Sequence, residues 1–262
     1  MTHGAADVSE ALHGHPPCGI ASTDGLGASA PTVRQIGLAT LYLGDARHVL
    51  RGVRADVVIT DPVWPNCPAG LLPGANGMQG ALTRLALDIL LPVRTAVLVL
   101  GFDSDPRWLA EAVPPELPYI RSQQLPYAFP GYRGRLLAGD EMAYVFGGIP
   151  AGRGVIPGRA RTKTKTKERS AHPCPRQEVH MESLVGWWTL ETDIVVDPFM
   201  GTGTTGVAAV SAGRQFVGAE IDRAYFDLAC ERIEQAQQQQ TLPLAPNAEV
   251  TGVPALSARP VD

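Results

Sequence analysis

The chain has 262 residues, of which 45% are hydrophobic, and it carries a formal net charge of −4. This length suits one α/β domain with a sizeable core. No apolar run approaches the ~18 residues of a membrane-spanning helix, and the N-terminus lacks the basic and apolar regions of a signal peptide, so we expect no membrane partner. The four cysteines form no Cys-x-x-Cys motif, which favours a reducing, cytoplasmic compartment.

The two ends of the chain differ in composition from its middle. Residues 1–32 are rich in Gly, Ala, Ser, Pro and His, which is typical of a disordered leader. A glutamine run leads into Pro- and Ala-rich sequence, so we expect a disordered tail over residues 238–262. The folded domain is therefore expected over residues 33–237.

Between these ends, apolar runs typical of strands alternate with helical patterns. The predicted strands are 38–43, 56–60, 96–100, 121–127, 141–146, 194–196 and 216–220. The predicted helices are 45–52, 81–90, 107–112, 180–189, 204–212 and 223–237, the last capped by Asp222. This alternation predicts an α/β fold with a mostly parallel sheet and helices on both faces. No long helical pattern separates 121–127 from 141–146, so we expect these two strands to form an antiparallel pair.

A glycine-rich turn follows the predicted strand 194–196 and reads Asp-Pro-Phe-Met-Gly-Thr-Gly-Thr-Thr-Gly over residues 197–206. Such a turn at the start of a helix presents backbone N–H groups to a ligand. Glu220 ends the next apolar run, at about the 20-residue distance where a carboxylate meets a ribose hydroxyl. The segment therefore predicts a site for an adenosine-bearing cofactor.

The glycine spacing also matches the fingerprint of nicotinamide and flavin enzymes, so an oxidoreductase is an alternative. Asp197 argues against it, because a carboxylate at the mouth of the site repels pyrophosphate and suits a cationic ligand. No Lys-Ser/Thr pair follows the glycines, which excludes a phosphate-binding P-loop. A plain strand-to-helix turn explains the glycines but not Asp197 and Glu220 together.

A second polar motif, Thr-Asp-Pro-Val-Trp-Pro over residues 60–65, also ends an apolar strand. Open α/β sheets keep their active sites at the carboxyl ends of strands. Proline stiffens the turn, so the Asp61 carboxylate and the Pro62 carbonyl can accept hydrogen bonds from one NH₂ group while Trp64 offers a flat stacking face. The motif therefore suits an aromatic amine. A strand stop with Trp64 packed into the core is the alternative.

Positive charge is concentrated in residues 151–169, which contain seven basic side chains and one acidic side chain. Such a cluster suits nucleic-acid phosphates, although a solvated loop has the same composition. The candidate DNA-binding residues are Arg153, Arg159, Arg161, Lys163, Lys165, Lys167 and Arg169. The spacing of His172, Cys174 and His180 fits no usual zinc pattern, so we predict no metal site.

The order of these motifs resembles the amino-group DNA methyltransferases (N6-adenine and N4-cytosine) of the permuted β arrangement. In that family a catalytic (Asp/Ser/Asn)-Pro-Pro-(Tyr/Phe/Trp) motif comes first, a DNA-recognition segment follows, and Asp-Pro-Phe-x-Gly-x-Gly-Thr-Thr comes last. Here Asp61–Trp64, residues 149–171 and Asp197–Thr205 occupy these places. Gly44-Asp45 resembles the family's Gly-Asp pair, and His172-Pro173 resembles its His-Pro motif. Val63 departs from the pattern, since the family usually has a second proline there.

This resemblance implies a Rossmann-like methyltransferase fold with S-adenosyl-L-methionine as cofactor. The catalytic residues it implies are Asp61, Pro62 and Trp64. Asp45 is expected at the adenine and Glu220 at the ribose. The full set of implied cofactor-binding residues is Asp45, His172, Asp197, Pro198, Phe199, Gly201, Gly203, Thr204, Thr205 and Glu220.

The implied function is methyl transfer to the exocyclic amino group of a flipped-out base in double-stranded DNA, as in restriction–modification systems. An Asp at the first catalytic position favours N6 of adenine. An N4-cytosine enzyme and a catalytically silent DNA-binding relative remain alternatives. We expect a prokaryotic or phage-encoded monomer or homodimer acting in the cytoplasm.

Overall fold

The computed structural model describes residues 31–70, 75, 78–127, 131–133, 135–162 and 177–241. Several sequence predictions lie outside these residues: most of the leader, the tail beyond Thr241, and the side chains of Lys163, Lys165, Lys167, Arg169 and His172. Within the described part, no helix combines the length and the apolar character needed to cross a bilayer.

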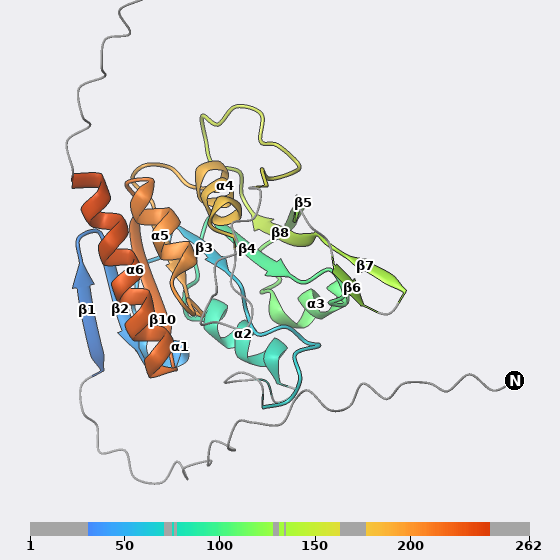
Figure 1. Cartoon of the computed structure of the whole chain (residues 1–262), viewed down its shortest axis with the longest axis horizontal. Coiled ribbons are helices and arrows are strands. Elements are labelled where there is room, and N and C mark those ends of the chain that lie inside the picture. The colour runs from blue at the N-terminus through green and yellow to red at the C-terminus, as the bar shows by residue number, and fades with distance from the viewer. Residues whose placement is uncertain are drawn as a thin grey trace, which may run out of the picture. The chain divides into compact units, whose positions relative to one another are not determined.

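An eight-stranded sheet forms the centre of the described chain, in the order β1-β2-β10-β9-β3-β4-β8-β5 (Figure 1). Five neighbouring strands, β2, β10, β9, β3 and β4, run parallel, whereas β1 and β8 are antiparallel to their neighbours. The strands of this sheet are β1 (Thr32–Ile36), β2 (Ala39–Leu43), β3 (Val57–Thr60), β4 (Thr95–Leu100), β5 (Tyr119–Leu125), β8 (Glu141–Gly147), β9 (Ile194–Asp197) and β10 (Gln215–Glu220). The mostly parallel sheet and the antiparallel β5–β8 pair confirm the predicted fold class.

Helices cover both faces of the sheet, because alternate side chains of the central strands enter two separate cores. Val57 and Ile59 pack with α4, α5 and α6, whereas Val58 between them packs with α1, α2 and the segment around α3. The helices are α1 (Ala46–Val49), α2 (Gln79–Asp88), α3 (Leu109–Ala112), α4 (Glu178–Trp188), α5 (Thr204–Ser211) and α6 (Arg223–Thr241), with a 3₁₀ turn over Pro106–Trp108.

The structure adds elements that the sequence did not indicate. Strand β1 was not predicted, because four of its five residues are exposed and it carries no apolar alternation. A short hairpin of β6 (Gly131–Arg133) and β7 (Leu136–Ala138) lies between β5 and β8. Helix α6 continues to Thr241, past the predicted end at residue 237, while Asp222 caps its start by accepting from Ala224 and Tyr225 N–H groups as expected.

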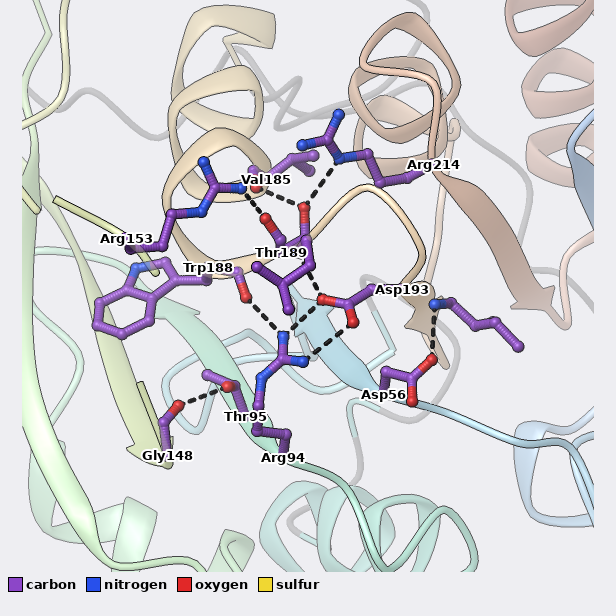
Figure 2. A network of polar contacts seen from close by, with 12 residues as sticks. Asp56, Arg94, Thr95, Gly148, Arg153, Val185, Trp188, Thr189, Asp193 and Arg214 are labelled. Carbon is purple, nitrogen blue, oxygen red and sulfur yellow. Dashed lines mark hydrogen bonds and ion pairs between the residues drawn. The ribbon is translucent and has the colours of Figure 1, made fainter. Parts of the chain in front are cut away.

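A polar network ties the amino ends of the strands to the end of α4 (Figure 2). The Arg94 guanidinium donates to both carboxylate oxygens of Asp193 and to the Trp188 carbonyl. Asp193 is buried and also accepts from the Leu190 N–H. Although burial opposes ionisation, Arg94 and this N–H hold the pKa of Asp193 below its ordinary value. The network therefore fixes α4 to β4 and β9.

We expect Arg94→Met to lower the free energy of unfolding by about 2 kcal/mol at neutral pH, because it leaves a buried carboxylate without its cation. Arg84→Met is the matched control. It removes an i,i+4 pair with Asp88 at the surface of α2 and should change stability little. Urea unfolding measures both. Equal effects of the two substitutions would contradict a structural role for the Arg94 network.

Candidate active site

Four carboxylates lie at the carboxyl ends of four neighbouring parallel strands. In sheet order they are Asp45 just after β2, Glu220 at the end of β10, Asp197 at the end of β9 and Asp61 just after β3. Neighbouring strands in a sheet are about 4.8 Å apart, so the four acids form a row across the carboxyl ends of these strands. Residues spread over 175 positions of sequence thus meet at one end of the sheet, the place where α/β folds bind ligands.

Asp197 is the most deeply buried of the four acids, at 2% exposure. Its Oδ1 accepts the Thr60 hydroxyl at 2.7 Å and the Phe199 N–H at 3.1 Å. Burial raises the pKa of Asp197 to about 7, the neighbouring Asp61 acts in the same direction, and hydrogen bonds from Thr60, Thr205 and Phe199 oppose the shift. A buried carboxyl in this setting favours a cationic ligand, whose charge would stabilise its ionised form.

Asp61 is oriented by the tryptophan three residues later. The Trp64 indole N–H donates to Asp61 Oδ1 at 2.9 Å and to the Val99 carbonyl at 3.2 Å. The ring lies against Gly101, where a Cβ would come within 2.5 Å of its Cζ3. A glycine after β4 therefore makes room for the indole. Trp64 is half-buried and packs against the core. It therefore both packs into the core and lies beside Asp61.

Glu220, at the end of β10, holds the glycine-rich turn through its carboxylate. Its Oε2 accepts the Gly201 N–H at 2.9 Å and its Oε1 accepts the Asp222 N–H at 2.8 Å. Burial raises the pKa of this carboxyl, and the N–H groups of Asp222 and Gly201 work against that shift. Pro198 and Thr204 are buried, and Gly203 has a positive φ of 80° at the start of α5. The predicted cofactor residues 197–205 thus form one continuous turn beside Glu220.

Asp45 lies at the other end of the row and caps α1. It accepts the Arg47 N–H at 2.9 Å and forms an ion pair with the Arg47 guanidinium. These hydrogen bonds hold its pKa below the ordinary value, despite partial burial. The preceding Gly44 donates its N–H to the Glu220 carbonyl at 2.8 Å. That hydrogen bond places Asp45 beside β10 and the other acids.

The described part of the basic segment runs along the edge strand β5. Gly158 and Ala160 exchange backbone hydrogen bonds with Gln124, and the Gln123 side chain donates to the Pro157 carbonyl. Through β8, Gln124 lies level with Leu100, the last residue of β4. The exposed Arg159 beside it is therefore at the same end of the sheet as the four acids.

Arg153 and Arg161 differ in their surroundings. Arg153 is half-buried and its guanidinium donates to the Thr189 carbonyl at the end of α4 (Figure 2). Arg161 is exposed and follows the stretch paired with β5. The segment thus begins at an anchored arginine near the amino ends of the strands and passes exposed arginines at the carboxyl ends.

Thr60 is a site residue whose role was not predicted from the sequence. Its hydroxyl is fully buried and joins β3 to β9 through Asp197. The sequence gives a weak signal, a threonine directly before an Asp-Pro turn, but its partner is 137 residues away. Within the described chain, no group of three His, Cys, Asp or Glu side chains is placed to hold a metal ion. The site instead combines carboxylates with a turn of backbone N–H groups.

A family model described as DNA methylase matches residues 136–231. The type II methyltransferase M2.DpnII of Streptococcus pneumoniae is 38% identical over 73 residues, 28% of this chain and 27% of that protein. The DNA adenine methyltransferase YhdJ of Escherichia coli (strain K12) is 33% identical over 76 residues, 29% of this chain and 26% of that protein. The chain is therefore similar to DNA methylases over the part that holds the glycine-rich turn 197–206. It spans about a quarter of the length of these curated relatives.

Two solved structures share the fold of this chain. The M1.HpyAVI–SAM complex aligns with a TM-score of 0.60 over 74% of this chain and 99% of that chain, at 21% identity. The cytosine-N4-specific PvuII DNA methyltransferase aligns with a TM-score of 0.54 over 77% of this chain and 90% of that chain, at 15% identity. The Rossmann-like methyltransferase fold expected from the motif order is therefore confirmed.

The raised pKa of Asp197 means that stability should depend on pH. The folded protein binds the proton of the Asp197 carboxyl more tightly than the unfolded chain does. The stabilisation from this protonated carboxyl is therefore complete below pH ~4 and is lost as the pH rises to about 7. Asp197→Asn removes this loss. We expect the free energy of unfolding of the variant, relative to wild type, to increase by about 2 kcal/mol between pH 5 and pH 8.

Urea unfolding at several pH values measures this difference. Asp193→Asn is the matched control. The pKa of Asp193 is lowered in the folded protein, so the pH dependence that this carboxyl causes lies below pH 5. The difference for Asp193→Asn should therefore be flat from pH 5 to pH 8. A flat difference for Asp197→Asn as well would rule out a carboxyl with a raised pKa at this position.

Proposed function

We propose that the protein is an S-adenosyl-L-methionine-dependent DNA methyltransferase that modifies the exocyclic N6 amino group of adenine. The observation that carries this proposal is the placement of Asp61 and Asp197 on neighbouring parallel strands, one beside an oriented tryptophan and the other beside a glycine-rich turn. We infer that they provide an acceptor for an amine next to a cradle for a cationic cofactor. The match of residues 136–231 to a DNA methylase family model supports the proposal.

The residues at the site fit S-adenosyl-L-methionine. Its positive charges suit Asp197 and Asp61, and the carboxylates of Glu220 and Asp45 suit ribose hydroxyls and the adenine amino group. Phe199 is partly buried at the turn and would pack against the cofactor. The bound cofactor supplies a methyl group activated on a sulfonium. The M1.HpyAVI structure, which shares this fold, is a complex with SAM.

The target base reaches such a site only after it leaves the duplex. The Asp61 carboxylate and the Pro62 carbonyl would accept hydrogen bonds from its NH₂ group, and Trp64 would provide an aromatic surface. These acceptors turn the nitrogen lone pair out of the ring and toward the cofactor side of the site. Asp61 then accepts the proton that the amino group loses. Orientation and fixed acceptors thus provide the rate, with no covalent bond to the protein.

The departure at Val63 is compatible with this function. A second proline would stiffen the turn through its fixed φ. Here the Trp64 indole makes two hydrogen bonds, to Asp61 and to the Val99 carbonyl, and its ring lies against Gly101. These contacts supply a constraint on the turn that proline would otherwise provide. We therefore propose an active enzyme in preference to a silent relative.

Adenine is favoured over cytosine by the aspartate at the first position of the catalytic motif. The Escherichia coli relative is a DNA adenine methyltransferase, whereas the PvuII enzyme is cytosine-N4-specific. Both chemistries use the same acceptors on an exocyclic NH₂ group. The identity of the methylated nucleoside therefore decides between the two bases.

Contact with DNA is proposed for the exposed arginines of the basic segment. Arg159 and Arg161 are exposed beside the edge strand β5, at the end of the sheet where the four acids lie. Phosphates held there would bring the duplex to the mouth of the site. Arg153 is instead proposed as an anchor, because its guanidinium is bound to the Thr189 carbonyl.

The proposal is tested with unmethylated duplex DNA and S-adenosylmethionine carrying a labelled methyl group. We expect label in N6-methyladenine after digestion, and a rate at least 10²-fold lower for Asp61→Asn, which loses the acceptor charge. Asp88→Asn, which alters a surface ion pair on α2, is the control and should retain the rate.

The outcomes separate the alternatives. N4-methylcytosine would correct the base and leave the reaction class intact. Bound DNA with no label above the Asp61→Asn background would identify a silent relative. Calorimetry should show binding of S-adenosylmethionine and none of NAD; the reverse result would identify an oxidoreductase.

Replacement of Arg159 and Arg161 by alanine should weaken DNA binding and make the slope of log Kobs against log salt shallower by about 1 for each lost phosphate contact. Arg54→Ala is the matched control, since this exposed arginine precedes β3 at the opposite end of the strand. Fluorescence anisotropy at several salt concentrations measures the slopes. An unchanged slope in the double variant would remove these arginines from the DNA interface.

A further inference from the structure

Arg232 on α6 makes four hydrogen bonds that reach the glycine-rich turn and α4. Its Nη1 donates to the Thr202 carbonyl at 2.6 Å, to the Thr202 hydroxyl at 3.1 Å and to the Thr204 hydroxyl at 3.2 Å. Its Nη2 donates to Glu178 Oε1 at 2.9 Å. Side-chain exposure is 25% for Arg232 and 49% for Glu178, so the arginine is the more enclosed partner.

The backbone of the turn leaves no space between itself and α6. Gly203 has φ +80°, and a Cβ at this position would lie 2.9 Å from the Ala229 Cβ on α6. Ala229 and Arg232 are three residues apart and therefore share a face of the helix. That face meets the turn through a close backbone contact at one point and a guanidinium at another.

The opposite side of the turn is held by Glu220, whose carboxylate accepts the Gly201 N–H. The Met200 N–H donates to the Ala219 carbonyl at 3.0 Å and the Gly203 N–H to the Met200 carbonyl at 2.8 Å. The turn is thus fixed by β10 on one side and by α6 on the other. On the α6 side, Arg232 makes three hydrogen bonds to Thr202 and Thr204 of the turn.

We propose that Arg232 is a positioning residue that holds the turn 201–204 in the shape that binds the cofactor. This inference rests on the proposed function, since the ligand of the turn is S-adenosyl-L-methionine. A loop already fixed in its bound shape loses less conformational entropy on binding, so the guanidinium contributes to affinity without touching the ligand. Glu178 supports the guanidinium from α4.

The test compares binding of S-adenosylmethionine to the full-length wild type, Arg232→Met and Arg232→Lys by calorimetry. Loss of charge-assisted hydrogen bonds should raise Kd about tenfold in Arg232→Met, and lysine should recover part of this loss. Affinity for DNA should stay within about twofold of wild type, because the turn is not part of the proposed phosphate contacts. Hydrogen exchange without any cofactor should be faster at the amides of residues 201–204 in Arg232→Met.

Arg223→Met is the matched control, because Arg223 forms an i,i+4 pair with Asp227 on the same helix. It should leave both affinity and exchange unchanged. The inference is overturned if Arg232→Met binds the cofactor like wild type, if Arg223→Met weakens binding equally, or if the turn exchanges at the wild-type rate. A wild type that binds no S-adenosylmethionine contradicts the proposed function, whereas the exchange measurement still reports on the turn.

Discussion

The hydrogen bond between the Thr60 hydroxyl and the buried Asp197 carboxyl joins the two strands on which the site depends. β3 and β9 are parallel neighbours in the sheet, and each leads into an Asp-Pro turn at the same end of the sheet. A buried carboxyl is costly unless hydrogen bonds or a counter-charge stabilise it. Thr60, Thr205 and the Phe199 N–H meet part of this cost, and a cationic ligand would meet the rest.

The remaining parts of the site follow from this constraint. The turn after Asp197 is fixed against β10 through Glu220 and against α6 through Arg232. On the other side, the Trp64 indole fixes the Asp61 carboxylate beside β4. The polar network around Arg94 holds α4 at the far end of the strands, so the basic segment starts from a fixed point.

Much of this arrangement was predictable from local patterns. Apolar runs that end in Asp61 and Asp197 indicated buried parallel strands, and carboxyl ends of such strands meet at one edge. Strand β1 was missed because its exposed residues follow no apolar period. The roles of Thr60 and Arg232 were missed for another reason. Their partners are 137 and about 30 residues away, and no local pattern encodes such pairs.

Proton release on cofactor binding tests the central claim most directly. If Asp197 is the carboxyl that receives the positive charge, binding near pH 6.5 must displace its proton. Calorimetry of S-adenosylmethionine binding in buffers of different ionisation enthalpy measures the number of protons released. The account predicts roughly half a proton or more per bound cofactor in the wild type and none from this group in Asp197→Asn. A binding enthalpy that is the same in every buffer would contradict it.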